Sequence, residues 1–381
     1  MKIEQLKWMD KEGWLSNPSG KLEKSAQLVL IFGSTNILKE KKRYDEIKSF
    51  YPAAHIFGCS TAGEIMDTQV SDDTLVVTAV YFEHTQLQCA QTKIDEVENS
   101  FQAGEQLAAS LEKDGLIHVF VLSDGHKVNG SELVKGLTKN LPSQISVTGG
   151  LAGDGERFEQ TLVCLDSFTE DPNIAVMGFY GTRLKIGYGS MGGWDSFGPD
   201  RLITRSKENV LYELDGQSAL ELYKKYLGDQ AAGLPATGLL FPLSIRFNLD
   251  EADTGLVRTI LLVNEEEQSM TFAGDVPEGA YARLMKANFD RLVDGAIGAA
   301  NTSYEAIGSI TPDLAVLISC VGRKLILQQR IEEEVESVRE VLGDNAVMTG
   351  FYSYGEISPF VPSAKCELHN QTMTITTFSE K

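Results

Sequence analysis

The form G-x-x-x-x-G-E-I occurs at two distant places in the chain, as GCSTAGEI at residues 58–65 and as GFYSYGEI at residues 350–357. Each copy follows a buried apolar run, a polar segment with helical spacing and a second short apolar run. A third, weaker copy begins with HVFVLSDG at residues 118–125 and ends with ISVTGGLAGDG at residues 145–155. Repeated units of strand, helix and strand predict parallel strand pairs, because a helical crossover returns the chain in its original direction.

Other segments alternate apolar and polar side chains with a period of two, as antiparallel strands do. They cover residues 74–92, 160–191 and 366–378 and are rich in Thr, Val, Tyr and Phe. We therefore expect an α/β fold with mixed parallel and antiparallel sheets, and not an all-parallel doubly wound sheet.

A domain boundary is predicted between residues 195 and 235. The turn-rich segment GGWDSFGPDR lies at its start and is followed by the amphipathic helical pattern ELDGQSALELYKKYLG. We expect an N-terminal extension at residues 1–27 and two tandem, distantly similar α/β modules at residues 28–215 and 216–381.

Charge and composition restrict the partners and the location. The chain has 34 basic and 54 acidic residues, a formal net charge of −20, so its surface repels phosphate groups. We expect neither a nucleic acid nor a membrane-inserted state, because no apolar run approaches the roughly 18 residues of a spanning helix. The N-terminus lacks the apolar segment of a signal peptide. Five widely spaced cysteines, an odd number, suit free thiols in a cytoplasmic protein.

Several familiar catalytic and metal motifs are absent or incomplete. GYGSMG at residues 187–192 matches G-x-G-x-x-G but leads into Trp194 and Pro199, so we interpret it as a strand-end turn. Ser60 lies in G-x-S-x-x-G, one residue longer than a nucleophile elbow. The sequence has no P-loop, C-x-x-C or H-E-x-x-H motif, and its five histidines are dispersed, so we do not expect a structural zinc site.

One group of candidate ligand-binding residues lies in the central repeat. His126 follows the strand that ends near Asp124, where α/β sheets present ligand-binding groups, and Asn129 opens the next helix. His126 is the histidine best placed to bind haem iron, and the alternative is an exposed loop histidine. Gly149 and Gly150 belong to a glycine-rich turn whose free N–H groups are suited to a carboxylate or propionate.

A second group of candidates comes from the two G-E-I motifs. Gly63 with Glu64 and Gly355 with Glu356 hold equivalent places, and two carboxylates in one cleft would bind an amine or act as acid and base. Arg323, after the third buried strand, is a candidate clamp for a ligand carboxylate. The alternatives are that each glutamate accepts a backbone hydrogen bond and that the arginine forms an ion pair.

Two tyrosines complete the candidate ligand set. Tyr352 and Tyr354 alternate along the turn before the second G-E-I motif. Their rings are suited to lining an aromatic pocket, and the alternative is that they fill the core.

Five motifs in consecutive order resemble the FIST sensory-domain family, including both its N-terminal and C-terminal modules. They are GCSTAGEI, VTGGLAGDG, GGWDSFGP with the nearby ELDGQSALELYKKYLG, GFYSYGEISP and CELHNQTMTITTF. The resemblance covers nearly the whole chain and implies a ligand-binding signal-input protein, not an enzyme. Some stand-alone members, of the NosP type, bind haem, sense nitric oxide and act on a separate histidine kinase or on cyclic-di-GMP enzymes. The resemblance thus implies haem as a cofactor, a gaseous or small-molecule ligand and a signalling partner of one of these kinds.

Other functions stay open on the residues themselves. The chain is alternatively a sensor of an amino acid or similar zwitterion, bound by Glu64, Glu356 and Arg323. It is also compatible with an enzyme that uses the two glutamates as acid and base, or with an interaction scaffold. A homo-oligomer is compatible with the sequence.

Overall fold

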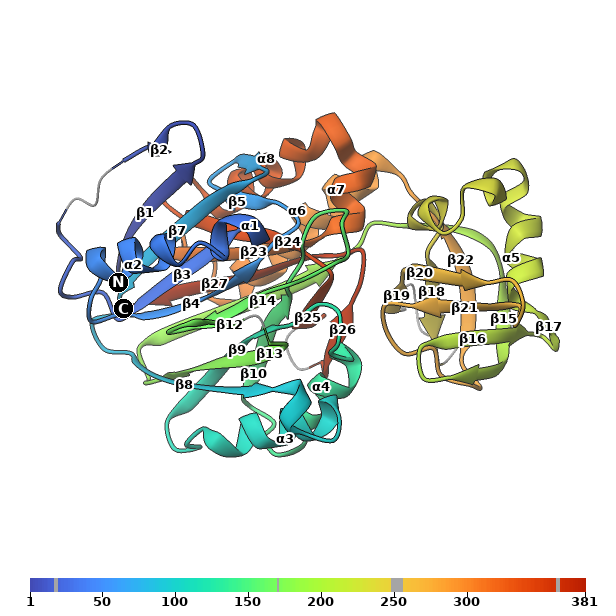
Figure 1. The fold of residues 1–381 in the computed structure, drawn as a ribbon, viewed down its shortest axis with the longest axis horizontal. Coiled ribbons are helices and arrows are strands. Elements are labelled where there is room, and N and C mark those ends of the chain that lie inside the picture. The colour runs from blue at the N-terminus through green and yellow to red at the C-terminus, as the bar shows by residue number, and fades with distance from the viewer. Residues whose placement is uncertain (17–19, 170, 248–255, 361–363) are drawn as a thin grey trace.

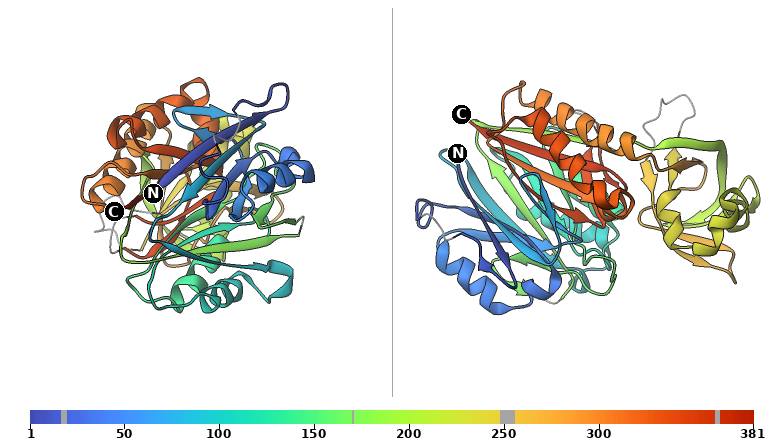
Figure 2. Two further views of the ribbon diagram at one scale, coloured as in Figure 1. Left: turned by 90° about the vertical axis from the view of Figure 1, so that its left-hand side faces the viewer. Right: turned by 90° about the horizontal axis from the view of Figure 1, so that it is seen from above.

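The chain forms a large body of three sheets and a smaller body, at residues 195–286, that stands beside it (Figure 1). The computed structural model describes residues 1–16, 20–169, 171–247, 256–360 and 364–381. The view from above in Figure 2 shows the smaller body set apart at one end of the large one. The predicted α/β class with mixed sheets is confirmed.

Each sheet of the large body is described here in its spatial order. The first sheet contains β12 (Phe168–Thr169), β11 (Val163–Leu165), β4 (His55–Ser60), β3 (Leu28–Gly33), β7 (Thr74–Tyr81), β1 (Lys2–Met9) and β2 (Gly13–Trp14). The second contains β26 (Cys366–His369), β25 (Gly355–Pro359), β10 (Ser146–Leu151), β9 (Leu116–Ser123), β13 (Asn173–Tyr180) and β8 (Gln86–Lys93). The third contains β6 (Gln69–Ser71), β5 (Glu64–Met66), β24 (Val347–Ser353), β23 (Leu314–Cys320), β27 (Met373–Glu380) and β14 (Leu184–Met191).

The three sheets share one plan. Each is centred on a parallel pair, β3 with β4, β9 with β10 and β23 with β24, flanked by antiparallel strands. The strand that follows each pair leaves its own unit: β5 joins the third sheet, β11 the first and β25 the second. The three repeats in the sequence therefore correspond to three units that exchange one strand in a cycle.

Helices cover the outer faces of these sheets. The first sheet carries α1 (Thr35–Leu38) and α2 (Lys41–Phe50), the second α3 (Ser100–Ser110) and α4 (Gly130–Lys139), and the third α6 (Phe289–Ala306), α7 (Val321–Leu327) and α8 (Ile331–Leu342). Helix α4 illustrates how the sequence sets them. The Asn129 side chain accepts the Glu132 N–H at its start, and Leu133 and Leu137 are buried on one face. Single 3-10 turns occur at η1 (Ile94–Glu96) and η4 (Gln328–Arg330).

The inner faces of the three sheets meet in one apolar core. Phe32, Phe57, Phe120, Phe351 and Phe378 come from all three units, and each is at most 2% exposed. Burial of side chains this large contributes the main stabilising free energy of the body.

The first glycine of each repeat allows close strand packing. A Cβ atom on Gly58, Gly149 or Gly350 would lie 1.9, 1.8 and 1.9 Å from a backbone carbonyl oxygen of the neighbouring parallel strand. No side chain fits at such a distance, so the repeat needs glycine here.

The smaller body is an insertion between β14 and α6. Its sheet has the order β19 (Leu256–Arg258), β18 (Leu243–Arg246), β22 (Tyr281–Lys286), β15 (Asp195–Lys207), β16 (Val210–Leu214), β21 (Ser269–Phe272) and β20 (Ile260–Asn264), with β17 (Gln217–Ser218) beside β16. Packed against it are α5 (Ala219–Leu227), η2 (Gly228–Gly233) and η3 (Ala236–Leu240). The division into modules at residues 28–215 and 216–381 stays a prediction, while in space the strands from both sides of residue 215 share sheets. Across the described ranges, every helix is too short or too polar to traverse a bilayer.

Candidate functional site

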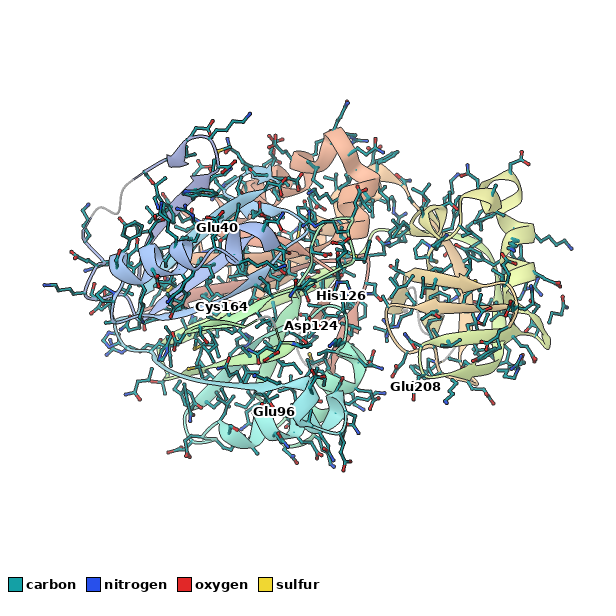
Figure 3. All side chains as sticks on the ribbon, in the orientation of Figure 1. Glu40, Glu96, Asp124, His126, Cys164 and Glu208 are labelled. Atoms are coloured by element: carbon teal, nitrogen blue, oxygen red, sulfur yellow. The ribbon has the colours of Figure 1, made fainter. Side chains whose placement is uncertain are left out.

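A cavity of about 360 Å³ lies between the large and the smaller body. Figure 3 labels His126 on one side and Glu208 on the other. The large body contributes Gly125, His126, Lys127, Val128, Asn129, Leu151, Phe158, Cys320, Val321, Gly322, Tyr354 and Asn370, and the smaller body Glu208, Asn209, Leu239, Thr259, Leu261, Phe272, Ala273 and Gly274. The wall is thus apolar for the most part, with amide, hydroxyl and charged groups at intervals, as in small-molecule sites.

Two polar side chains in this wall are buried without partners. Asn370 is 1% exposed, and neither its amide oxygen nor its amide nitrogen has a hydrogen-bond partner among the described residues. Thr259 is 4% exposed, and its hydroxyl is likewise unpartnered within those residues. Buried polar groups are nearly always hydrogen-bonded, and each one that is not costs roughly 1–3 kcal/mol. These atoms have almost no accessible surface, so a polar ligand in the cavity would reach them only after a small shift of the wall.

The two groups approach the cavity from opposite bodies. Asn370 follows β26 in the large body, and Thr259 lies between β19 and β20 in the smaller one. Next to Thr259, the guanidinium of Arg258 donates to the Asp275 carbonyl oxygen at 2.9 Å and, across the boundary, to that of Leu368 at 3.0 Å. Burial lowers the pKa of Arg258 to about 10. This arginine holds the smaller body against β26.

Further polar contacts between the bodies surround the cavity. The Asn129 amide donates to an Asp275 carboxylate oxygen at 3.2 Å, and the Lys135 ammonium lies 3.0 Å from the other oxygen. These contacts are partly exposed, and an apolar cluster in which Val257 packs with Ile326 and Leu327 adds to them.

His126 lies in the wall with its side chain 26% exposed. Its Nε2 is 3.9 Å from Asp154 Oδ1, and its ring meets the edge of Tyr354 at 5.4 Å. Burial opposes ionisation of Asp154, but hydrogen bonds from the Tyr354 hydroxyl and from two backbone N–H groups outweigh it and hold the pKa of Asp154 below its usual value. His126 therefore already faces an ionised carboxylate.

A second cavity, of about 350 Å³, lies where loops of all three units meet. Glu64 and Gly63 line it, together with Ser34, whose buried hydroxyl has no partner within the described part of the chain. Lys324 also lines it and donates to the Ala62 carbonyl oxygen at 2.8 Å and to Asp72.

The two motif glutamates have identical structural roles. Glu64 accepts hydrogen bonds from the Thr61 hydroxyl and from the N–H and hydroxyl of Thr74. Glu356 does the same with Ser353 and with the N–H and hydroxyl of Thr372. They lie in different sheets, and Glu356 lines neither large cavity. The structure thus does not bring the two carboxylates to one cleft, and their shared role is to anchor exchanged strands.

Arg323 lies in the core. It is fully buried and pairs with Glu334 at 2.8 Å, so it does not face either large cavity. The Tyr352 hydroxyl also donates to Glu334, at 2.6 Å. Gly149 and Gly150 are paired within β10, and Gly355 within β25. Of the sequence candidates, the first cavity therefore gathers His126, Asn129 and Tyr354, with Asp124 next to it, where it accepts the His126 N–H at 3.0 Å.

Sequence reasoning missed Thr259 and Asn370. Their only local signal is weak: Asn370 belongs to the motif CELHNQTMTITTF, and Thr259 lies in a plain alternating segment. The predicted boundary at residue 195 coincides with the start of the insertion, but no local pattern indicates that Thr259 returns to the same cavity as Asn370.

Two protein-family models match consecutive parts of the chain. The model of the FIST N domain matches residues 27–217, and that of the FIST C domain matches residues 219–359. The chain belongs to the FIST family. This FIST protein is 23% identical over 369 residues to an uncharacterized protein of Methanocaldococcus jannaschii, covering 86% of this chain and 69% of the relative.

Two solved structures are distantly similar to this FIST protein. A chorismatase shares 8% identity with a TM-score of 0.37, covering 99% of this chain and 98% of the other. A cyanuric acid hydrolase from A. caulinodans shares 9% identity with a TM-score of 0.35, with the same coverage of both chains. These values are too low to carry a functional argument.

Proposed function

We propose that this FIST protein is a signal-input protein that binds a small polar molecule in the cavity between its two bodies. The observation that supports it most is that Asn370 and Thr259, which belong to the wall of one cavity and come from different bodies, carry buried polar groups without partners among the described residues. A ligand that bonds to both would hold the bodies together more tightly than the empty cavity does. Such differential binding is what a sensor requires.

The wall also indicates the ligand class. The Asn370 amide needs both a donor and an acceptor, and Lys127 and Glu208 add one charge of each sign. Leu151, Phe158 and other apolar side chains form an apolar part of the wall. A free amino acid or an amino-acid amide carries all the matching groups, so we propose this class in place of the set Glu64, Glu356 and Arg323.

Haem with nitric oxide is a second candidate, because His126 is part of the same wall. The residues fit haem less well. The Nε2 atom of His126 is directed at the ionised Asp154 and would have to leave it before binding iron. A Soret band in protein isolated with haem supplied, lost in His126→Ala, would establish haem binding. A histidine kinase or a cyclic-di-GMP enzyme as partner, and a cytoplasmic location, stay predictions from the family.

The test is a thermal-shift screen of the full chain with the standard amino acids and their amides. A ligand at 100 times its dissociation constant adds about 2.7 kcal/mol of stability. We expect Thr259→Val to raise the stability of the ligand-free protein, since it removes an unsatisfied hydroxyl, and to weaken the ligand response at least tenfold.

Ser34→Ala is the matched control, because it removes an unpartnered buried hydroxyl from the other cavity. Loss of the response in Ser34→Ala but not in Thr259→Val would move the site to the second cavity. The absence of a shift with every compound would contradict an amino-acid ligand.

A further inference from the structure

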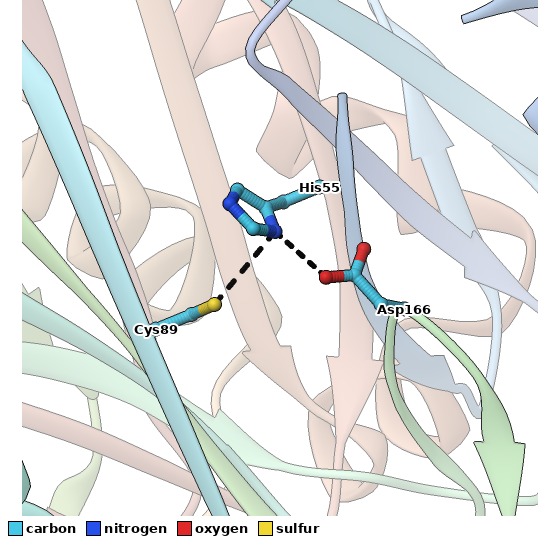
Figure 4. A group of neighbouring side chains, drawn as sticks. All are labelled: His55, Cys89 and Asp166. Carbon is cyan, nitrogen blue, oxygen red and sulfur yellow. Dashed lines mark hydrogen bonds and ion pairs between the residues drawn. The ribbon is translucent and has the colours of Figure 1, made fainter. Parts of the chain in front are cut away.

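Outside both cavities, three side chains with metal-binding atoms meet on the large body. His55 begins β4, Cys89 lies in β8, and Asp166 follows β11 (Figure 4). The His55 Nδ1 atom is 2.7 Å from Asp166 Oδ2 and 3.7 Å from Cys89 Sγ, and the three potential ligand atoms all lie within 4.8 Å of one another.

The surrounding structure holds this group in place. Asp166 has a positive φ of 57°, and its Oδ1 accepts the Ile56 N–H at 2.9 Å, which leaves Oδ2 to face His55. Its own N–H donates to the Ile56 carbonyl oxygen at 2.8 Å, and the Tyr44 hydroxyl donates to its carbonyl oxygen. The backbone therefore fixes the carboxylate, and two strands fix the other side chains.

The geometry argues against a nucleophilic cysteine. In a cysteine–histidine–aspartate triad, the thiol and the carboxylate bind opposite nitrogens of the ring, so that a proton passes through it. Here both contacts converge on the same nitrogen, Nδ1 (Figure 4). Three donor atoms around one point is instead the arrangement of a metal site.

We propose that His55, Cys89 and Asp166 form a three-ligand zinc site with one open position. Zinc binds imidazole nitrogen, thiolate and carboxylate with bonds of about 2.0–2.3 Å, so tetrahedral ligand atoms lie about 3.3–3.7 Å apart. The nitrogen–sulfur separation already has this value, and the nitrogen–oxygen separation needs to open by roughly 0.6 Å as the metal replaces the hydrogen bond. The His55 and Asp166 side chains are 42% and 39% exposed, so the ion and a fourth ligand such as water reach the site from solvent.

The three ligands come from distant parts of the chain, which explains why spacing motifs did not reveal them. The first sheet brings β4 and β11 side by side, with Cys164 paired opposite Gly58. Cys89 comes from β8, which is the edge strand of the second sheet. The site thus lies where two sheets adjoin, and a bound metal would connect them.

The test is titration of the metal-free, chemically reduced full chain with Co²⁺ as a spectroscopic substitute for zinc. We expect one ion per chain and a thiolate-to-cobalt charge-transfer band, which Zn²⁺ then abolishes by displacement. Cys89→Ser and His55→Ala are expected to remove the band and weaken Zn²⁺ binding at least tenfold. Asp166→Asn is expected to weaken binding while it keeps the hydrogen bond to Ile56.

Cys366→Ser is the control, because this half-buried thiol lies outside the group and donates to the Val147 carbonyl oxygen. It is expected to leave the band unchanged. A wild-type protein without a band, a band that survives in both Cys89→Ser and His55→Ala, or a band lost in Cys366→Ser would overturn the proposal. Circular dichroism of each variant separates loss of metal from loss of fold.

Discussion

Replacing Arg323 by methionine tests whether this residue holds the core or binds a ligand. Its guanidinium donates to Glu334 at 2.8 and 3.1 Å, to the Leu292 carbonyl oxygen at 2.7 Å and to that of Gly192 at 2.5 Å. Both partners of the ion pair are 0% exposed. Removing the arginine leaves a buried carboxylate that still accepts from Tyr352 but has lost its counter-charge.

Breaking a buried pair in this way costs about 3–5 kcal/mol. We therefore expect Arg323→Met to lower the free energy of unfolding by about that amount in urea denaturation monitored by circular dichroism. The double variant Arg323→Met/Glu334→Met is expected to lose less than the sum of the two single variants, by roughly 2 kcal/mol or more, because it leaves no unpaired charge.

A loss below about 1 kcal/mol, or additive effects in the cycle, would refute a buried ion pair. The ligand-clamp interpretation makes the opposite prediction: nearly unchanged stability and an abolished ligand-induced thermal shift. One variant thus distinguishes the two roles.

Three further perturbations follow from the same structure. Burial raises the pKa of Glu64 from 4.5 to about 7, although its hydrogen bonds act in the opposite direction, so the folded state favours the protonated carboxyl group. The contribution of this group to stability is therefore complete below pH 4.5 and is lost as the pH rises toward 7. Glu64→Gln is expected to flatten this decline, reducing the difference in unfolding free energy between pH 5 and pH 7.5 by about 1–3 kcal/mol, and an unchanged slope would contradict the shift. Gly350→Ala is expected to lower the free energy of unfolding by about 3 kcal/mol or more, because a Cβ atom there would meet the Leu317 carbonyl oxygen. Gly279→Ala, in open space at a φ of 85°, is expected to lower it by only about 1 kcal/mol, and equal losses in thermal denaturation would contradict the close packing. Asp275→Asn is expected to increase hydrogen–deuterium exchange at the boundary between the two bodies by weakening the contact with Lys135, with less than about 1 kcal/mol of global destabilisation; unchanged exchange would count against the contact.

The strand–helix–strand repeats could be predicted from the sequence because their signals are local. Each buried apolar run, helical pattern and glycine turn lies within a short segment, and period alone identified the antiparallel strands. The exchange of β5, β11 and β25 was not predictable in the same way. Which sheet a three- or five-residue strand joins depends on partners that are distant in sequence.

The candidate site shows the same division. His126 and Asn129, which were selected for their position after a strand end, line the first cavity, and their binding role stays a prediction. The matching motifs suggested that Glu64 and Glu356 share one cleft. In a cyclic arrangement of three units, however, corresponding residues lie at the same place in different units and are therefore apart. The repeat thus predicts that the two glutamates accept hydrogen bonds in the same way, which was the alternative interpretation. It does not predict that they lie close together.

The cyclic exchange also determines where a ligand signal can pass. Every unit of the large body contributes a strand to another unit, and the phenylalanine core fills the space between the sheets, so relative motion of the units would break several strand pairings at once. The smaller body is different, because the chain enters it just after Gly192 and leaves it just before α6, and Arg323 binds carbonyl groups on both sides of that passage. The strand exchange therefore favours the insertion as the part that a ligand would move, with Arg323 at its base and the first cavity at its contact face. We expect a ligand in that cavity to change the position of the smaller body against the three-unit frame.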